Sequence, residues 1–272
     1  MFKNLLFTLT LLVLLSSCEE VIQIDLNSAN PAFVVEAKIQ HDSVGQVRLT
    51  RTTSYFSADE PGFIENAKVY LSDGSSKEEL SYQENGYYMG EAITGIQNRI
   101  YTIEIIHDGK TYQGVSTLPA KTEIISIRYY KGETPTILNP NGEVVYTFQF
   151  EFVDDPEVKN FYMVSLVRDG KMIENRYFLF TESLTNGGTL ENNGGNILSF
   201  AESVFTTEGE VAVNLFSIDE PVYNYFMHLD DVLFWKRRVM PPTPYNPVSN
   251  VDNGALGYFA AWGLDTRQLI LE

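Results

Sequence analysis

The amino-acid sequence predicts a mainly β protein, in which an N-terminal β-sandwich is followed by a second β-rich unit that carries one amphipathic helix. Aromatic and β-branched residues alternate with polar residues in short runs, which Gly, Asn and Asp residues separate, and one segment has helical periodicity. We expect a signal peptide over residues 1–17, a lipidated linker over 18–30, the sandwich over 31–119 and the second unit over 120–272.

The first segment has the pattern of a bacterial lipoprotein signal peptide. Residues 5–15 are apolar apart from two threonines, and Ser17 and the only cysteine, Cys18, follow them. This run is shorter than the roughly 20 residues of a spanning helix and fits a signal peptide. We expect the lipoprotein signal peptidase to cut between Ser17 and Cys18, with lipid attached to Cys18. The alternatives are an ordinary secretory signal with a coincidental cysteine, or a short membrane anchor.

The charge of the chain excludes some partners. The formal net charge is −17, and loss of the basic residue Lys3 with the signal makes it −18. A body this acidic is not expected to bind nucleic acid by counterion release or to adhere unaided to anionic lipid. We therefore expect the membrane to be held through the N-terminal lipid, with more than one acyl chain needed for stable anchoring.

Residues 31–119 contain about seven short strands, which is enough for one sandwich. Residues 33–39 and 46–50 are the first two alternating runs. Asp73-Gly74 predicts a turn, and Asp108-Gly109 between two β-type runs predicts a hairpin. The order of a Val-Tyr-Leu strand, Asn-Gly-Tyr-Tyr at 85–88 and a later Tyr-Thr-Ile strand resembles transthyretin-like or carboxypeptidase-regulatory-like sandwiches. We therefore expect an immunoglobulin/transthyretin-like sandwich.

The second unit contains two long predicted strands, over residues 144–152 and 160–168, that are separated by an acidic turn. Residues 185–196 are rich in Asn, Gly and Thr and are predicted to be a mobile loop.

One helix is predicted over about residues 219–238. Ser217 and Glu220 fit a capping box, and Pro221 suits the first turn. We expect this helix to pack on the second unit by an apolar face with a spacing of three and four residues. The predicted members of that face are Val222, Tyr225, Phe226, Leu229, Val232 and Leu233.

Several blocks together resemble the domain-of-unknown-function 4249 lipoproteins of Bacteroidota. These blocks are Cys18-Glu19-Glu20, residues 33–37, 48–52, 66–71 and 152–162, and the C-terminal stretch 246–259. The resemblance covers nearly the whole mature chain. It implies an outer-membrane lipoprotein, often encoded beside TonB-dependent receptors, and it brings no catalytic residues or cofactor. Glu19 and Glu20 also resemble a signal for export to the cell surface, or they simply begin a solvated linker.

Few residues suggest chemistry. The chain has three histidines and lacks the common hydrolase and phosphate-binding motifs, so we assign no catalytic residue and no cofactor. Asp154, Asp155 and Glu157 are candidate Ca²⁺ ligands, but their spacing also fits a turn.

Aromatic residues in turn-rich stretches are candidates for binding a sugar or a protein partner. Local packing of these side chains explains their presence as well. They are Tyr55, Phe56 and Tyr245.

Three functions follow as hypotheses. The first is a non-enzymatic binding or accessory partner of a TonB-dependent transporter in the outer membrane. The second is a stand-alone surface glycan-binding or adhesion module. The third is a hydrolase with an unrecognised site.

Overall fold

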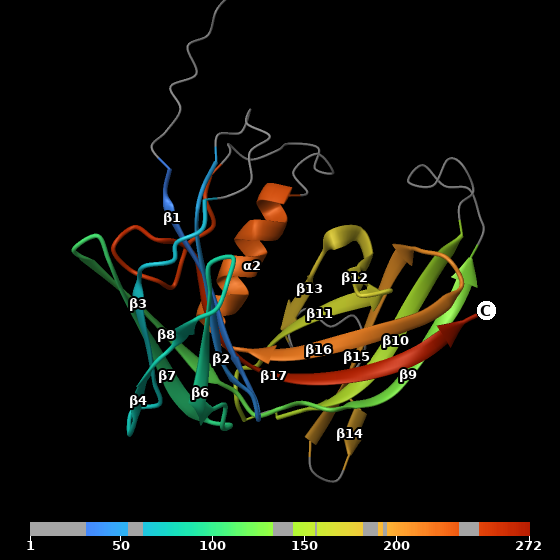
Figure 1. Cartoon of the computed structure of the whole chain (residues 1–272). Coiled ribbons are helices and arrows are strands. Elements are labelled where there is room, and N and C mark those ends of the chain that lie inside the picture. The colour runs from blue at the N-terminus through green and yellow to red at the C-terminus, as the bar shows by residue number, and fades with distance from the viewer. Residues whose placement is uncertain are drawn as a thin grey trace, which may run out of the picture. The chain divides into compact units, whose positions relative to one another are not determined.

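Alternating side chains build the first half of the protein into a sandwich of two facing sheets (Figure 1). In β1 (Phe33–Gln40) and β8 (Lys110–Leu118) every second side chain is buried, because successive residues of a strand point to opposite faces. The other strands are β2 (Val44–Arg51), β3 (Lys68–Ser72), β4 (Lys77–Glu79), β5 (Ser81–Tyr82), β6 (Tyr87–Thr94) and β7 (Arg99–His107). Their buried faces share one hydrophobic core.

The structure is a computed structural model that describes residues 31–53, 62–132, 144–155, 157–181, 190–192, 195–233 and 245–272. The predicted signal peptide and linker, with Ser17 and Cys18, lie outside these residues.

A second sandwich has its own aromatic core. One sheet contains β9 (Ile124–Gly132), β10 (Val145–Asp154), β14 (Leu190–Asn192) and β15 (Gly195–Phe205). The facing strands are β11 (Phe161–Arg168), β12 (Lys171–Met172), β13 (Phe178–Thr181) and β16 (Gly209–Ile218), with the short 3₁₀ helix η1 (Ile173–Asn175) after β12. The ring of Phe152 meets that of Tyr162 edge-on, with centroids 4.8 Å apart. The predicted mainly β fold class is confirmed.

The last strand, β17 (Leu256–Leu271), belongs to both halves. It pairs in parallel with β1 and antiparallel with β16, and so joins the strands into one nine-stranded sheet. Phe259 and Ala261 lie in the first core, whereas Leu271 lies in the second. The predicted boundary at residue 119 assigns the whole of β17 to the second unit. In the structure the first half of β17 packs in the first sandwich.

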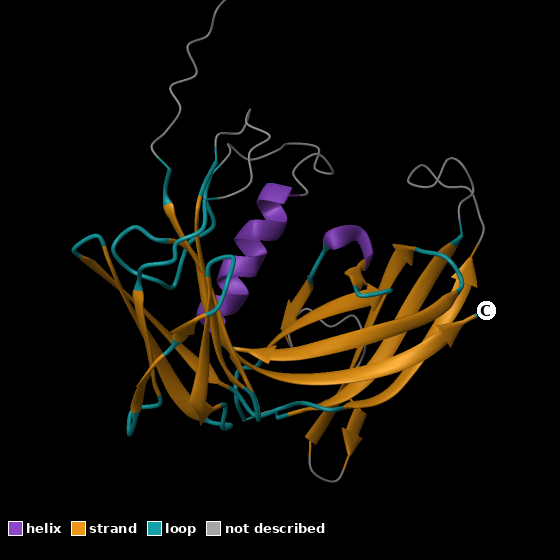
Figure 2. Cartoon of the chain, in the orientation of Figure 1, coloured by secondary structure: helices purple, strands orange, loops and turns teal. Residues whose placement is uncertain are grey.

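The helix α2 (Glu220–Leu233) is the one α-helix in the described residues (Figure 2). It contacts β11, β13 and β17 on the face of the nine-stranded sheet that points away from the second core. Its buried side chains are Val222, Tyr223, Tyr225 and Phe226. The predicted helix and its packing are confirmed, but Leu233 is 53% exposed and does not belong to the buried face. Residues 234–238 of the predicted helix lie outside the described part.

The predicted capping box is wrong. Asp219 caps the helix, because its Oδ1 accepts the N–H of Val222 at 3.1 Å. Its Oδ2 accepts the Ser116 hydroxyl at 2.9 Å and the Thr117 N–H at 2.8 Å, so the same carboxylate holds β8. The hydroxyl of Ser217 is occupied elsewhere, since it accepts the N–H of Thr122 at 3.1 Å.

The predicted loop over residues 185–196 is wrong in its last part. Residues 190–192 pair antiparallel with 195–197 as the hairpin of β14 and β15. Main-chain hydrogen bonds make this pairing, so a polar composition does not prevent it. Residues 185–189 and 193–194 lie outside the described part.

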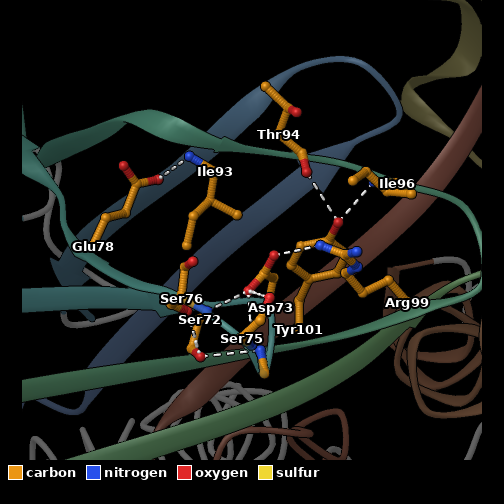
Figure 3. A network of polar contacts seen from close by, with 11 residues as sticks. Ser72, Asp73, Ser75, Ser76, Glu78, Ile93, Thr94, Ile96, Arg99 and Tyr101 are labelled. Atoms are coloured by element: carbon orange, nitrogen blue, oxygen red, sulfur yellow. Dashed lines mark hydrogen bonds and ion pairs between the residues drawn. The ribbon is translucent and has the colours of Figure 1, made fainter.

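The turn predictions at Asp73-Gly74 and Asp108-Gly109 are confirmed, with φ of +84° at Gly74 and +73° at Gly109. Figure 3 shows Asp73 at the centre of a polar network. Its Oδ1 accepts the N–H groups of Ser76 at 2.7 Å and Ser75 at 3.0 Å, and its Oδ2 pairs with the guanidinium of Arg99. These donors, the two backbone N–H groups first, lower the pKa of Asp73 to about 2.

This pKa predicts a pH-dependent effect for Asp73→Asn. Since the folded pKa lies below the usual 3.8, the carboxylate contributes stability that is complete above about pH 4 and is lost as pH falls through about 2. We expect the variant to lose about 1–2 kcal/mol of unfolding free energy at pH 7. Urea unfolding at pH 7, 4, 3 and 2 should show the difference from wild type shrinking with acidity. A difference that is constant over this range would contradict the assignment.

Candidate binding site

Four polar or aromatic residues lie side by side across four neighbouring strands. Glu36 of β1 pairs with Tyr258 of β17 on one side and with Arg48 of β2 on the other, and Arg48 pairs with Tyr87 of β6. Directly paired residues point to the same face of a sheet. The four side chains, which we call the cross-strand row, therefore lie together on the face opposite the first core.

Arg48 is the centre of this row. Its Nη1 lies 3.6 Å from Glu36 Oε2, and its guanidinium carbon lies 5.2 Å from the ring centroid of Tyr87 and 5.6 Å from that of Phe63. The rings hold the guanidinium by cation–π contacts. Its Nε is buried and has no hydrogen-bond partner among the described residues. A buried donor without a partner costs free energy, so a local rearrangement that gave this atom an acceptor would be stabilising.

The helix and the segment after η1 add tyrosines beside Tyr258. The rings of Tyr225 and Phe226, both on the buried face of α2, lie 5.1 Å and 4.9 Å from the ring of Tyr258. Tyr177 packs edge-on against Phe226 at 5.0 Å. The apolar periodicity that buries α2 therefore also brings Tyr225 to the end of the cross-strand row.

Burial raises the pKa of these phenols above the ordinary value of tyrosine. It raises the pKa of Tyr225 to about 12, with the negative charge of Glu36 adding to the shift. The same two causes raise the pKa of Tyr177. Burial also raises the pKa of Tyr258, with smaller contributions first from Tyr177 and then from Glu36. At neutral pH these hydroxyls are hydrogen-bond donors and acceptors and not proton-transfer groups. In the part of the chain that the structure describes, the hydroxyls of Tyr87, Tyr177, Tyr225 and Tyr258 make no hydrogen bond with protein groups.

The cross-strand row borders a polar cavity of about 130 Å³, which we call the tyrosine cleft. Lys38 and Gln46, which pair with each other one step along the same face, also line it, together with Ala37. A second cavity of about 160 Å³ lies between η1 and α2, where it is lined mainly by apolar side chains. The tyrosine cleft is the better candidate site, because convergent polar groups with free hydrogen-bonding capacity are typical of ligand sites.

The aromatic candidates from the sequence are not part of this cleft. Tyr245 is 38% exposed, and its hydroxyl lies 3.4 Å from Asp231 Oδ2 near the end of α2. Its ring meets that of His228 edge-on at 5.8 Å. Tyr55 and Phe56 lie outside the described residues.

Two of the three candidate Ca²⁺ ligands accept hydrogen bonds from protein groups. Asp154 is buried and accepts a hydrogen bond from the Tyr162 hydroxyl in the second core. Asp155 Oδ1 accepts the N–H of Glu157 at 3.0 Å, which is the geometry of an Asx turn. Within the described ranges, no three His, Cys, Asp or Glu side chains come together as a possible metal site.

Sequence reasoning missed the tyrosine cleft, although it found β1 and β2, because it predicted no strand over the residues of β17. Glu36, Lys38 and Arg48 are the polar members of alternating runs, and such residues usually face solvent. The available signal was the density of charge on one face of the first two strands. It does not reveal that Tyr258, near the other end of the chain, lies beside Glu36.

Comparison with known proteins identifies one family. Residues 19–268 match a family described as a domain of unknown function, DUF4249. No curated protein matches the chain. Among the described residues, no helix has the length and apolar character needed to cross a membrane.

Proposed function

The chain belongs to the DUF4249 family. From this premise we propose that it is a lipid-anchored binding protein of the bacterial outer membrane. In this proposal it is a non-enzymatic accessory partner of a TonB-dependent transporter. The tyrosine cleft carries the proposal. The hydroxyl groups of Tyr87 and Tyr258 lie there beside an ion pair of Arg48 and Glu36, which suits recognition by hydrogen bonds. The pattern that ends at Cys18 supports the anchor, and the family resemblance supports the membrane and the class of partner.

Replacing Cys18 with alanine tests the anchor. We expect Cys18→Ala, combined with replacement of residues 1–17 by an ordinary cleavable secretory signal, to prevent lipid attachment while the signal is still removed. The protein should then shift from the membrane to the soluble fraction, since a body with a net charge near −18 has little attraction for anionic lipid. Cell fractionation with immunoblotting measures the shift. Ser17→Ala keeps a small residue at the cleavage site and is the matched control, expected to remain in the membrane. Retention of the Cys18→Ala protein in salt-washed membranes would contradict lipid anchoring.

Affinity isolation tests the partner. The native lipoprotein, purified from detergent-solubilised outer membranes, is expected to bring with it a TonB-dependent β-barrel receptor, identified by mass spectrometry. The Cys18→Ala protein, isolated in the same way from the soluble fraction, is the control for adventitious capture. Recovery of the lipoprotein without a receptor would overturn the accessory role. It would favour the second candidate, a stand-alone surface glycan-binding module, for which the tyrosine cleft is also suited.

A further inference from the structure

The tyrosine cleft contains both hydrogen-bond donors and hydrogen-bond acceptors. Arg48 and Lys38 only donate, the carboxylate of Glu36 only accepts, and Gln46 does both. The phenol hydroxyls of Tyr87 and Tyr258 also donate and accept. A ligand hydroxyl is itself both donor and acceptor, so a molecule with several adjacent hydroxyls can satisfy this set. A ligand that carries only acceptors would offer no donor to Glu36.

The charges of the cleft favour a neutral ligand. Glu36 lies 3.6 Å from Arg48, directly opposite it on the neighbouring strand. An anion that approaches the guanidinium also approaches this carboxylate, and a cation that approaches the carboxylate meets Arg48 and Lys38. Either charge would therefore meet repulsion at short range, whereas a neutral polar molecule can hydrogen-bond to both members of the pair.

The shape and size of the tyrosine cleft restrict the class of ligand further. Tyrosine rings stand at both ends of the cross-strand row, and a phenol ring is a flat apolar surface on which the C–H face of a sugar ring can pack. The cavity of about 130 Å³ is smaller than the roughly 300–1,000 Å³ of drug-sized pockets. It has room for one ring, while the rest of a longer molecule stays outside.

From these observations we propose that the tyrosine cleft binds one neutral sugar residue of a glycan, with Arg48, Glu36 and Gln46 hydrogen-bonding to its hydroxyls and Tyr87 and Tyr258 packing against its ring. The inference rests on the proposed function, because it names the ligand class of the same site.

Binding of glycans by the intact lipoprotein tests the inference. The mature lipidated protein in detergent is applied to an array of neutral oligosaccharides and of matched sialylated, sulfated and uronic-acid glycans, and hits are titrated by calorimetry. We expect neutral glycans to bind and acidic ones to bind at least tenfold more weakly. Arg48→Met is expected to weaken binding tenfold or more, and Tyr258→Phe, which removes one hydroxyl and keeps the ring, several-fold, in line with the usual effect of one lost hydrogen bond.

Matched controls separate the cleft from general effects. Arg128→Met and Tyr130→Phe change the same residue types on the exposed part of β9 and should leave the affinity within twofold of wild type. Circular dichroism melting confirms that each variant is folded. If Arg48→Met does not fold, the milder Tyr258→Phe and a Gln46→Met variant carry the test.

The possible outcomes distinguish the ligand class from the proposed function. Preference for acidic glycans, no glycan binding, or wild-type affinity in the folded cleft variants would overturn the sugar ligand. If the receptor is still recovered with the lipoprotein in that case, the accessory role stands. Binding of neutral glycans that depends on the cleft, but without receptor recovery, supports the ligand class and overturns the accessory role.

Discussion

Gly257→Ala is expected to lower the free energy of unfolding by about 3 kcal/mol or more, because two independent penalties meet at this residue. Gly257 has φ of +91°, a conformation that residues with a Cβ rarely adopt. A Cβ built here would also overlap with the backbone carbonyl oxygen of Val35 on β1. The neighbour is main chain, so no side-chain rotation can relieve the overlap. The parallel pairing of β1 with β17 would have to open. Urea unfolding measures the loss.

Gly254→Ala is the matched control for this prediction. Gly254 lies three residues earlier and has a similar φ of +79°, but no atom lies within 4 Å of its hypothetical Cβ. Its substitution should therefore cost only the conformational penalty, roughly 1–2 kcal/mol. Equal losses in the two variants would show that the overlap with Val35 is relieved. Since Tyr258 follows Gly257 directly, the larger loss should be accompanied by a displaced cross-strand row and weaker ligand binding.

Asp219→Ala is expected to destabilise the protein by about 2–3 kcal/mol, because one side chain joins two parts of the fold. The substitution removes the cap of α2 and leaves the Ser116 hydroxyl and the Thr117 N–H of β8 without their acceptor. Thermal and urea unfolding measure the loss.

Glu220→Ala is the control at the neighbouring position. Glu220 is an exposed carboxylate in the first turn of the same helix, and its ion pair with Lys159 at 2.7 Å lies at the surface. Such pairs contribute at most about 1 kcal/mol. A loss for Glu220→Ala as large as that for Asp219→Ala would show that charge near the helix end, and not the contacts of Asp219, stabilises the fold.

Asp219→Asn separates the hydrogen bonds of this side chain from its charge. Burial raises the pKa of Asp219 despite its hydrogen bonds. The folded protein therefore holds the proton of this carboxyl more tightly than the unfolded chain does, and the free energy of unfolding falls as pH rises from 3.8 through the folded pKa. A neutral amide removes the cost of burying the charge while keeping one acceptor oxygen. We therefore expect Asp219→Asn to lose less stability than Asp219→Ala at pH 7.

Local patterns predicted the elements well and their detailed contacts poorly. The Asp108-Gly109 hairpin and the amphipathic helix follow from turn chemistry and periodicity, which act over a few residues. The helix cap was misassigned because Ser217 and Asp219 are both good cap residues. Only the contact of Ser217 with Thr122, which is far away in the sequence, decides between them.

The candidate site was not predictable in the same way. Alternation in the strands shows which residues share a face, and this placed Glu36, Lys38 and Arg48 away from the core. It does not show which strands become neighbours. Tyr258 and Glu36 come from opposite ends of the chain, and their pairing depends on β17 inserting between β16 and β1.

The sequence by itself determined the mainly β fold class, the single amphipathic helix, the turn positions and the family resemblance. Each of these depends on residue types and spacings within a short stretch, or on the order of such stretches. The tertiary structure alone decided that one strand joins both sandwiches, that Asp219 ties the helix to β8, and that three charged residues and two tyrosines converge in one cleft. Strand pairing and register over long distances are set by the packing of the whole chain, and no local pattern encodes them.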